Sequence, residues 1–336
     1  MDNGRWTVAS RPEDQVEEAN FQFVSESVGE PEDGEFLIGT RYLVVSPPAR
    51  MALTSGGIAR RPVPIGATMR GTGLGQVVAS RHPGFAEGEL VIGDLGWQEY
   101  AISDGATRHP VRKVAARPGM PESTLLHVLG AGGATAYFGM IEYAKPHVGD
   151  TLVVSAAAGN VGSLVCQLGR LQGCRVVGIA GSDEKCSWLT NDLGCAAAIN
   201  YKREDVAAAL DGACPDGIDV YFDNVGGEIL DAALARIAQG ARVVLCGGTS
   251  QYNHDLDWYG PKNYFNLVYR QAEMAGFYVY NFSHRFEEAF GRLESLLATG
   301  ELKYAEDVLQ GIGQTPAALI RVLKGENFGV QLVRVA

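Results

Sequence analysis

The chain has 336 residues, 46% hydrophobic and 20% charged, which is typical of a globular protein with about two domains. The formal net charge of −11 and the lack of a basic block argue against nucleic acid or anionic membrane surfaces as partners. No run of 18 apolar residues occurs, so no transmembrane helix is predicted.

The first third of the chain, from about residue 20 to 120, consists of short β-prone runs broken by glycine and proline. This pattern predicts a compact β-rich domain with many turns. The expected strands are Phe36–Ser46, Gly75–Ser80, Leu90–Ile92 and Trp97–Ser103.

From about residue 125 to 300, apolar strands alternate with segments of helical spacing, such as Val161–Gln172 and Asp183–Leu193. Six strands with crossover helices predict an α/β fold with a doubly wound parallel sheet. The expected strands are Thr151–Ser155, Arg175–Ala180, Ala197–Asn200, Ile218–Phe222, Ala241–Cys246 and Met274–Val279.

The tail after about residue 300 returns to short strand-like pieces, including Val330–Val335, around one helix near Pro316–Leu323. We expect this tail to pack back on the β-rich domain. The predicted division is therefore a β-rich domain of residues 1–125, completed by 301–336, and an α/β domain of residues 126–300.

A turn of small residues in the α/β domain follows a short apolar run, in the string V-V-S-A-A-A-G-N-V-G from Val153 to Gly162. Gly159 and Gly162 have the spacing of a dinucleotide-binding turn, although Ala157 stands at the place of its first glycine. Backbone amides at such a helix N-terminus can hold a pyrophosphate. The position between a predicted strand and a predicted helix favours this interpretation over a plain tight turn.

The end of the second strand of this domain bears on the choice between NAD and NADP. The strand ends at Gly181, which has no carboxylate to repel a 2′-phosphate, and Ser182 and Lys185 follow with a hydroxyl and a cation. Tyr201, together with the adjacent Lys202, could close the far side of the same pocket. These residues favour NADP.

Two acids in the same segment, Asp183 and Glu184, complicate that choice because they are close enough to serve as the acid of an NAD site. Their alternative role is favourable charge in the first turn of a helix that Ser182 caps.

Two glycine-containing strings follow the fourth and fifth strands: Tyr221–Gly227, which includes Asn224, and Cys246–Asn253. Both lie at carboxyl ends of strands, where doubly wound sheets bind their ligands. The alternative is ordinary turn chemistry of the glycines.

The six cysteines form no C-x-x-C pair, and none precedes residue 166. We expect buried free thiols in a reducing cytoplasm, and no metal site is predicted because clustered cysteines and histidines are missing. No HExxH, GxSxG or P-loop string occurs, which argues against metalloproteases, serine hydrolases and P-loop NTPases.

Taken together, these strings resemble zinc-independent medium-chain dehydrogenases/reductases of the leukotriene B4 dehydrogenase and prostaglandin reductase type. Plant alkenal double-bond reductases and bacterial NADPH-dependent curcumin reductases belong to the same group, and Gly96–Gly105 (GWQEYAISDG) looks most like the curcumin reductases. The resemblance runs through nearly the whole chain. Its other matching strings are Thr135–Gly139 (TAYFG), Ala156–Gly162 (AAAGNVG), Gly181–Lys185 (GSDEK), Asn200–Lys202 (NYK), Tyr221–Gly227 (YFDNVGG), Cys246–Asn253 (CGGTSQYN) and Gly325–Gly329 (GENFG).

The resemblance implies a GroES-like β domain and a Rossmann domain that binds NADPH. It implies that Lys185 and Tyr201, beside Ser182, hold the 2′-phosphate, and that the turn from Gly159 to Gly162 meets the pyrophosphate through Gly159, Asn160 and Val161. The rest of the cofactor would be lined by Asn224, Cys246, Gly247, Gly248, Thr249, Ser250, Tyr252, Phe277, Tyr278, Val279 and Asn327.

One string departs from the family. Where the family often reads D-P-Y-M-R near the start of its substrate cleft, this chain reads Ser46-Pro47-Pro48-Ala49-Arg50. Pro48 and Arg50 are the candidate substrate residues. Because the aromatic side chain expected at position 48 is absent, the substrate preference should differ from that of the named relatives.

The expected reaction is NADPH-dependent reduction of the C=C bond of an α,β-unsaturated ketone or aldehyde, without a metal. A hydride passes to the β-carbon, negative charge moves to the carbonyl oxygen, and a proton reaches the α-carbon. The site needs a donor aimed at that oxygen, and Tyr252 is the candidate. A cofactor ribose hydroxyl or water could serve instead, and Tyr252 would then only pack against the cofactor.

Two other functions remain open: an NADPH-dependent quinone oxidoreductase, and a non-catalytic NADPH-binding protein. We also expect a homodimer, because the aromatic strand Phe277–Tyr280 would end the parallel sheet with an open edge, which invites pairing across a two-fold axis.

Overall fold

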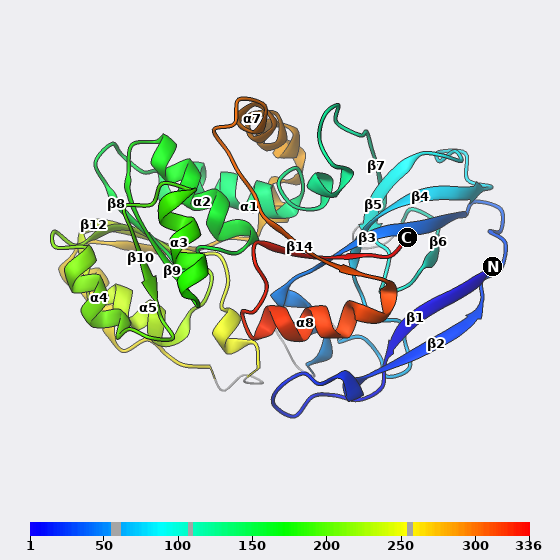
Figure 1. Cartoon of the computed structure of the whole chain (residues 1–336), viewed down its shortest axis with the longest axis horizontal. Coiled ribbons are helices and arrows are strands. Elements are labelled where there is room, and N and C mark those ends of the chain that lie inside the picture. The colour runs from blue at the N-terminus through cyan, green and yellow to red at the C-terminus, as the bar shows by residue number, and fades with distance from the viewer. Residues whose placement is uncertain (55–61, 107–109, 254–257) are drawn as a thin grey trace. The chain divides into compact units, whose positions relative to one another are not determined.

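The computed structural model describes residues 1–54, 62–106, 110–253 and 258–336 (Figure 1). The chain divides into two compact units. The first comprises Met1–His127 and Glu306–Ala336, and the second comprises Val128–Ala305.

The first unit contains a mainly antiparallel sheet in the order β14-β15-β3-β4-β5-β7, with β6 also paired to β3. A separate hairpin pairs β1 (Asp2–Val8) with β2 (Phe21–Ser27). The strands of the larger sheet are β3 (Phe36–Val45), β4 (Thr72–Ser80), β5 (Leu90–Asp94), β6 (Tyr100–Ser103), β7 (Arg112–Val114), β14 (Glu306–Gln310) and β15 (Val330–Arg334). The helical segments of the first unit are η1 (Glu18–Asn20), η2 (Pro47–Leu53), η3 (Glu122–Leu126), η8 (Ile312–Gln314) and α8 (Thr315–Leu323).

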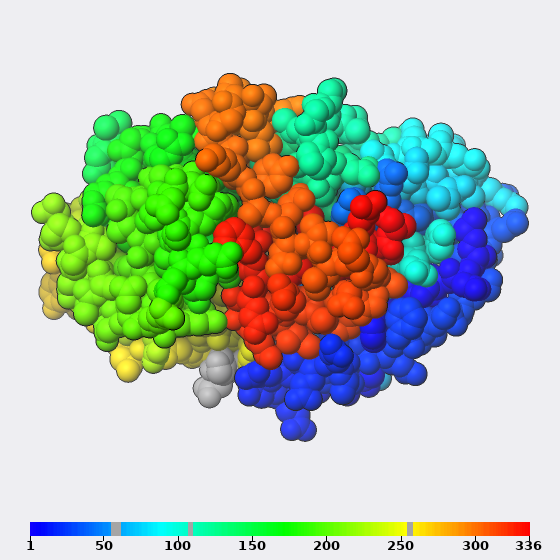
Figure 2. Space-filling view, viewed as in Figure 1, coloured from blue at the N-terminus to red at the C-terminus, as the bar shows by residue number. Residues whose placement is uncertain are grey.

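The C-terminal tail completes this unit. Strand β15 pairs with β3 in antiparallel register, with Leu332 opposite Val44, and β14 adds to its other side in parallel. Leu319 of α8 joins a buried cluster with Leu53 and Trp97. In the space-filling view the C-terminal segment, in orange and red, lies against the blue N-terminal residues of the same unit (Figure 2). The tail is therefore part of the hydrophobic core of the unit.

The second unit contains a six-stranded parallel sheet in the order β10-β9-β8-β11-β12-β13. In chain order this is 3-2-1-4-5-6, the arrangement of dinucleotide-binding folds, whose ligands bind where the order reverses between the first and fourth strands. The predicted α/β fold class is confirmed. The strands are β8 (Thr151–Val154), β9 (Arg175–Ala180), β10 (Ala197–Asn200), β11 (Ile218–Asp223), β12 (Ile237–Leu245) and β13 (Glu273–Gly276).

Helices connect these strands. Their apolar faces pack on the sheet and cover it. Leu210 of α4 and Leu230 of α5 pack with Val153, Val177 and Tyr221 of the sheet in one buried cluster, while α1 contacts both α2 and α7. The helical segments are α1 (Ala131–Phe138), η4 (Gly139–Ala144), α2 (Asn160–Leu171), α3 (Asp183–Asn191), α4 (Val206–Ala213), α5 (Gly227–Leu234), η5 (Thr249–Gln251), η6 (Asn263–Phe265), α6 (Asn266–Tyr269), η7 (Val279–Arg285) and α7 (Phe286–Ala298).

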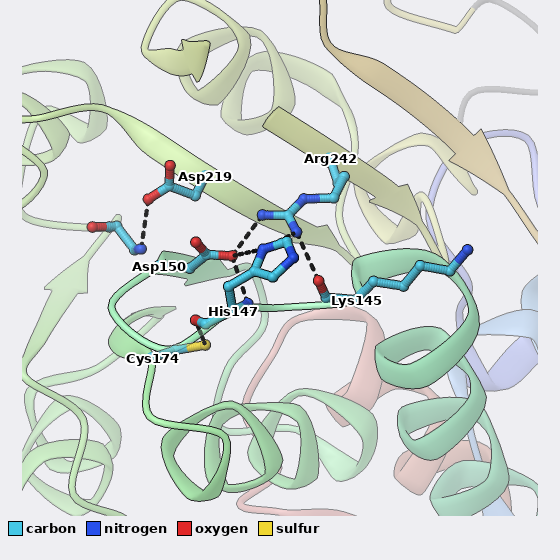
Figure 3. A network of polar contacts seen from close by, with 7 residues as sticks. Lys145, His147, Asp150, Cys174, Asp219 and Arg242 are labelled. Atoms are coloured by element: carbon cyan, nitrogen blue, oxygen red, sulfur yellow. Dashed lines mark hydrogen bonds and ion pairs between the residues drawn. The ribbon is translucent and has the colours of Figure 1, made fainter. Parts of the chain in front are cut away.

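A polar network around Arg242 fixes the amino end of the sheet (Figure 3). Arg242 donates to Asp150 Oδ2 at 2.6 Å and to the carbonyl of Lys145 at 2.7 Å, and its Nη1 lies 3.1 Å from His147 Nδ1. Asp219 accepts a hydrogen bond from the amide of Thr151 at 2.8 Å. These contacts join the starts of β8 and β11 to β12, at the end opposite the one where ligands of this fold bind.

The expected strand Met274–Val279 is wrong at its carboxyl end. Strand β13 stops at Gly276, and Val279 already belongs to η7, so the aromatic segment Phe277–Tyr280 lies outside the sheet. The last pair joins Gly276 to Leu245, where β12 also ends, so the ladder has no further partner. Phe277 instead stacks on Tyr143, with ring centroids 5.0 Å apart.

Among the described residues no helix is long and apolar enough to cross a membrane. All six cysteines are free thiols.

Replacing Leu332 by alanine tests whether the tail belongs to the core of the first unit. Leu332 is fully buried, so Leu332→Ala should lower the free energy of unfolding by about 2–5 kcal/mol, measured by urea denaturation. Val78→Ala, at an exposed position of β4 in the same sheet, is the control and should change it by less than about 1 kcal/mol. Equal effects of the two variants would show that the tail does not stabilise the unit.

Candidate dinucleotide-binding site

The turn after β8 brings the start of α2 against the backbone that precedes it. Ala156 adopts a left-handed conformation with φ of 47°. A Cβ atom at Gly162 would lie 2.3 Å from the carbonyl oxygen of Ala156, so only glycine allows this packing. Such close packing of helix on strand is the role of the last glycine in dinucleotide-binding turns.

The N-terminus of α2 is open to an anion. No described side chain caps it, and its first turn contains no acidic residue. The amides of Asn160, Val161 and Gly162 belong to that first turn, where N–H groups have no partner within the helix. The Asn160 side chain lies against α1, where a Cβ atom at Gly132 would meet its Nδ2 at 2.3 Å. The positive end of the helix dipole and these amides fit a pyrophosphate.

A buried polar cluster joins the turn after β8 to the turn after β11. Ser155 Oγ donates to Asp223 Oδ1 at 2.9 Å and accepts from the amide of Asn224 at 2.8 Å. Asn224 Nδ2 donates to the carbonyl of Ser155 at 2.7 Å. Ser155 and Asp223 are fully buried. The predicted cofactor residue Asn224 is therefore held by two hydrogen bonds to the neighbouring turn.

The Asp223 carboxylate is the centre of this cluster. It also accepts from Tyr221 at 3.0 Å and from the amides of Val225 and Gly226 at 3.1 and 3.0 Å. Burial raises the pKa of Asp223, and these hydrogen bonds oppose the rise. Its backbone carbonyl accepts from the amide of Cys246 at 2.8 Å, which ties in the turn after β12. One residue thus joins three turns at the carboxyl edge of the sheet.

Neither Ser155 nor Asp223 was singled out from the sequence. The signal that could have found them is an acid at the end of the apolar strand β11, beside a serine at the end of β8. A carboxylate in that position needs hydrogen-bond donors from neighbouring turns.

The loop after β12 holds Tyr252 and the predicted residues Cys246–Ser250. The Tyr252 hydroxyl accepts a hydrogen bond from the amide of Gly248 at 3.3 Å, and among the described residues no acceptor takes its own proton. Burial raises the pKa of Tyr252, so the phenol stays protonated at neutral pH. Thr249 and Ser250 attach the loop to the turn after β11, with Ser250 Oγ donating to the Val225 carbonyl at 2.7 Å.

Burial also raises the pKa of the Cys246 thiol, to about 12. The thiol is therefore neutral at physiological pH and is not prepared to act as a nucleophile.

Tyr201, directly after β10, lies over Gly181, directly after β9. A Cβ atom at Gly181 would lie 2.9 Å from Cε1 of Tyr201, so the glycine makes room for the ring. Ser182 caps α3, because its hydroxyl accepts from the amide of Lys185 at 3.2 Å. The ammonium of Lys202 lies 6.0 Å from the centroid of the Tyr201 ring. Gly181, Ser182, Lys185 and Tyr201 thus lie at the ends of neighbouring strands.

Four predicted cofactor residues lie outside the turns described so far: Phe277, Tyr278, Val279 and Asn327. Phe277 stacks on Tyr143, Tyr278 is exposed and Val279 begins η7. Asn327 belongs to the first unit, where its Nδ2 donates to the carbonyl of Gly329 at 2.8 Å.

The two candidate substrate residues have different surroundings. Pro48 is exposed at the start of η2. Arg50 is fully buried, and its guanidinium donates to Thr54 Oγ1 at 2.5 Å and to the carbonyl of Asp14 at 3.2 Å. Arg50 therefore stabilises the first unit from within, and we do not retain it as a substrate residue.

Within the described ranges no group of three His, Cys, Asp or Glu side chains is placed to hold a metal ion. The 3-2-1-4-5-6 sheet, the open helix N-terminus and the Gly181–Tyr201 contact define a dinucleotide-binding domain of the Rossmann type.

Comparisons with known proteins extend this assignment. Residues 4–111 match the family model described as the N-terminal domain of oxidoreductase, and residues 160–295 match the model described as zinc-binding dehydrogenase. The chain is 37% identical to the NADPH-dependent curcumin reductase of Escherichia coli over 339 residues, covering 99% of this chain and 97% of the relative. It is 39% identical to the NADP(+)-dependent 2-alkenal reductase of Nicotiana tabacum over 272 residues, covering 81% and 78%.

Among solved structures, CurA from Vibrio vulnificus in complex with NADPH superposes with a TM-score of 0.93 at 38% identity, covering 99% of both chains. The chain belongs to the medium-chain dehydrogenase/reductase family, as the sequence strings predicted.

Replacing Gly162 by alanine tests the close packing at the start of α2. The added methyl group would clash with the Ala156 carbonyl, so Gly162→Ala should lower the free energy of unfolding by about 1–3 kcal/mol and weaken dinucleotide binding. Gly291→Ala in α7 is the control, because a Cβ atom there meets nothing within 4 Å, and it should be neutral or mildly stabilising. Chemical denaturation and titration calorimetry measure both effects, and unchanged dinucleotide affinity in Gly162→Ala would contradict the site.

Proposed function

We propose that the chain is an NADPH-dependent reductase of the activated C=C bond of α,β-unsaturated ketones or aldehydes. The observation that carries the proposal is the loop that presents the protonated Tyr252 phenol beside the dinucleotide-binding turns. The similarity to a curcumin reductase and a 2-alkenal reductase along most of the chain supports it further.

The residues of the second unit fit NADPH. Asn160, Val161 and Gly162 would hold the pyrophosphate through their amides, while Lys185 and Tyr201 would hold the 2′-phosphate. Asn224 and the loop from Cys246 to Tyr252 would line the remainder, together with Phe277, Tyr278 and Val279. NADPH supplies the hydride that reduces the substrate.

Tyr252 would act on the substrate carbonyl oxygen. As reduction proceeds, negative charge develops on that oxygen, and a donor already in place stabilises it without reorganisation. The Gly248 amide occupies an acceptor site of the Tyr252 oxygen, which leaves the phenolic proton available for the substrate. The saturated product forms when a proton reaches the α-carbon.

The first test of this role is Tyr252→Phe. Loss of the hydroxyl should lower kcat about 10²-fold and leave the Kd for NADPH nearly unchanged, because the phenyl ring still packs in the loop. Steady-state kinetics and fluorescence titration of NADPH measure the two quantities. Tyr42→Phe, in β3 of the first unit, is the control and should change neither. An unchanged kcat in Tyr252→Phe would reject the donor role.

Pro48 is the residue that we propose to shape substrate preference. It is exposed in η2, and it stands where the resembling family often has a tyrosine. The smaller, rigid side chain would leave room for a bulkier substrate than that family accepts.

The activity is tested by following NADPH oxidation at 340 nm against enones, enals, quinones, simple ketones and alcohols, with identification of the products. We expect turnover of enones or enals to saturated carbonyl compounds. Turnover of quinones alone would favour the quinone oxidoreductase. NADPH binding without turnover of any acceptor would favour the non-catalytic protein.

We propose no metal in this reaction, since none of the cofactor and substrate residues forms a Cys or His cluster. The six free thiols fit a reducing cytoplasm.

A homodimer is also proposed, through the edge of the parallel sheet at β13. The segment immediately before this strand exposes four large apolar side chains, those of Tyr264, Phe265, Val268 and Tyr269, at 54%, 52%, 63% and 72%. An apolar patch beside an open strand edge is typical of a protein interface. The same patch on a second copy would cover it across a two-fold axis.

Light scattering at micromolar concentration should give the mass of a dimer. The double variant Val268→Asp/Tyr269→Glu should be monomeric, because it places charge in the interface. Val148→Asp, at a residue 86% exposed just before the central strand β8, should remain dimeric. A monomeric mass of the unmodified protein would contradict the proposal.

A further inference from the structure

Asp183 is the acid closest to the end of β9, where NAD-binding proteins place the carboxylate that binds the ribose 2′-hydroxyl. It is the first residue of α3, directly after the capping Ser182. In the structure both of its oxygens are already engaged. Oδ1 accepts from Asn200 Nδ2 at 2.6 Å, and Oδ2 forms an ion pair with Arg203.

Asn200 is fixed in the orientation that makes this contact. It is the last residue of β10 and only 5% exposed. Its side-chain oxygen accepts from the amide of Lys202 at 3.1 Å, so its Nδ2 must face Asp183. Its own amide donates to Glu204 Oε1 at 2.6 Å, and its carbonyl accepts from the amide of Arg203 at 2.9 Å. The turn after β10 therefore orients the side-chain amide of Asn200 and also places the guanidinium of Arg203 beside Asp183.

The Asp183–Arg203 pair contributes little to stability, because the two side chains are 59% and 72% exposed. Its effect is on the local charge. A carboxylate without its cation, next to Ser182 and Lys185, would repel a 2′-phosphate and would be free to accept a ribose hydroxyl. Paired with Arg203 and bonded to Asn200, it does neither. The other charged groups of this turn are Glu184, Lys185, Lys202 and Glu204, and Glu204 is bonded to the Asn200 amide.

We propose that Asn200 and Arg203 determine cofactor specificity by engaging Asp183, so that this acid neither binds the 2′-hydroxyl of NADH nor repels the 2′-phosphate of NADPH. The inference rests on the proposed NADPH dependence and names the residues that enforce it. Arg203 acts through Asp183 and is a positioning residue.

The test measures the Kd of NADPH and NADH for the protein without substrate, by titration calorimetry. Arg203→Gln should weaken NADPH about 3–10-fold, as expected for one uncompensated charge near a partly exposed phosphate, and leave NADH unchanged or slightly tighter. The NADPH effect should shrink as salt is raised, because salt screens the repulsion. Arg81→Gln, which breaks the exposed pair with Glu30 in the first unit, is the control for net charge and should change neither Kd.

The decisive variant is Arg203→Gln combined with Asp183→Asn. Removal of the exposed acid should restore the NADPH affinity that Arg203→Gln loses, since nothing is left to shield. Failure of this rescue, an equal loss for both cofactors, or no effect of Arg203→Gln on NADPH would each overturn the inference. Failure of the unmodified protein to bind NADPH would instead defeat the proposed function.

Discussion

The site depends on one buried carboxylate, Asp223. Parallel strands end at the same edge of a sheet, but the turns that follow them have no ladder to hold them together. Asp223 supplies that connection, because its side chain accepts from Ser155, Tyr221 and two amides of its own turn. Its carbonyl accepts from Cys246 in the turn after β12. The Tyr252 loop is positioned through these contacts, so the proposed chemistry rests on a residue that need not touch the substrate.

The N-termini of α2 and α3, at the carboxyl edge of the parallel sheet, differ in their charged residues. In the described part of the chain, the N-terminus of α2 has no side-chain cap and no acid in its first turn, and it remains open to a pyrophosphate. The α3 terminus is capped by Ser182 and bears Asp183, whose charge is matched by Arg203. At the amino end of the sheet the Arg242–Asp150 pair is a purely structural connection. Structural charges are thus paired, while the helix that would meet the cofactor phosphates is left positive.

The parallel sheet could be predicted because its buried strands are continuous apolar runs, and β9 and β10 were predicted to the residue. The end of β13 could not, since it is set by where β12 stops. The contact of Ser155 with Asp223 joins residues 68 positions apart, and the buried Arg50 bonds to Asp14, which lies far from it in the sequence. Neither the Ser155–Asp223 contact nor the burial of Arg50 could be predicted from a local sequence pattern. The glycine turn and Tyr201 could be proposed from the sequence because each lies in a short local string.

We propose that this site delivers a hydride to the β-carbon of an activated C=C bond. The most direct measurement uses NADPH deuterated at nicotinamide C4, an enone acceptor, and NMR of the product. We expect deuterium at the β-carbon and a solvent-derived hydrogen at the α-carbon of a saturated ketone. Deuterium on the carbonyl carbon of an alcohol would contradict it.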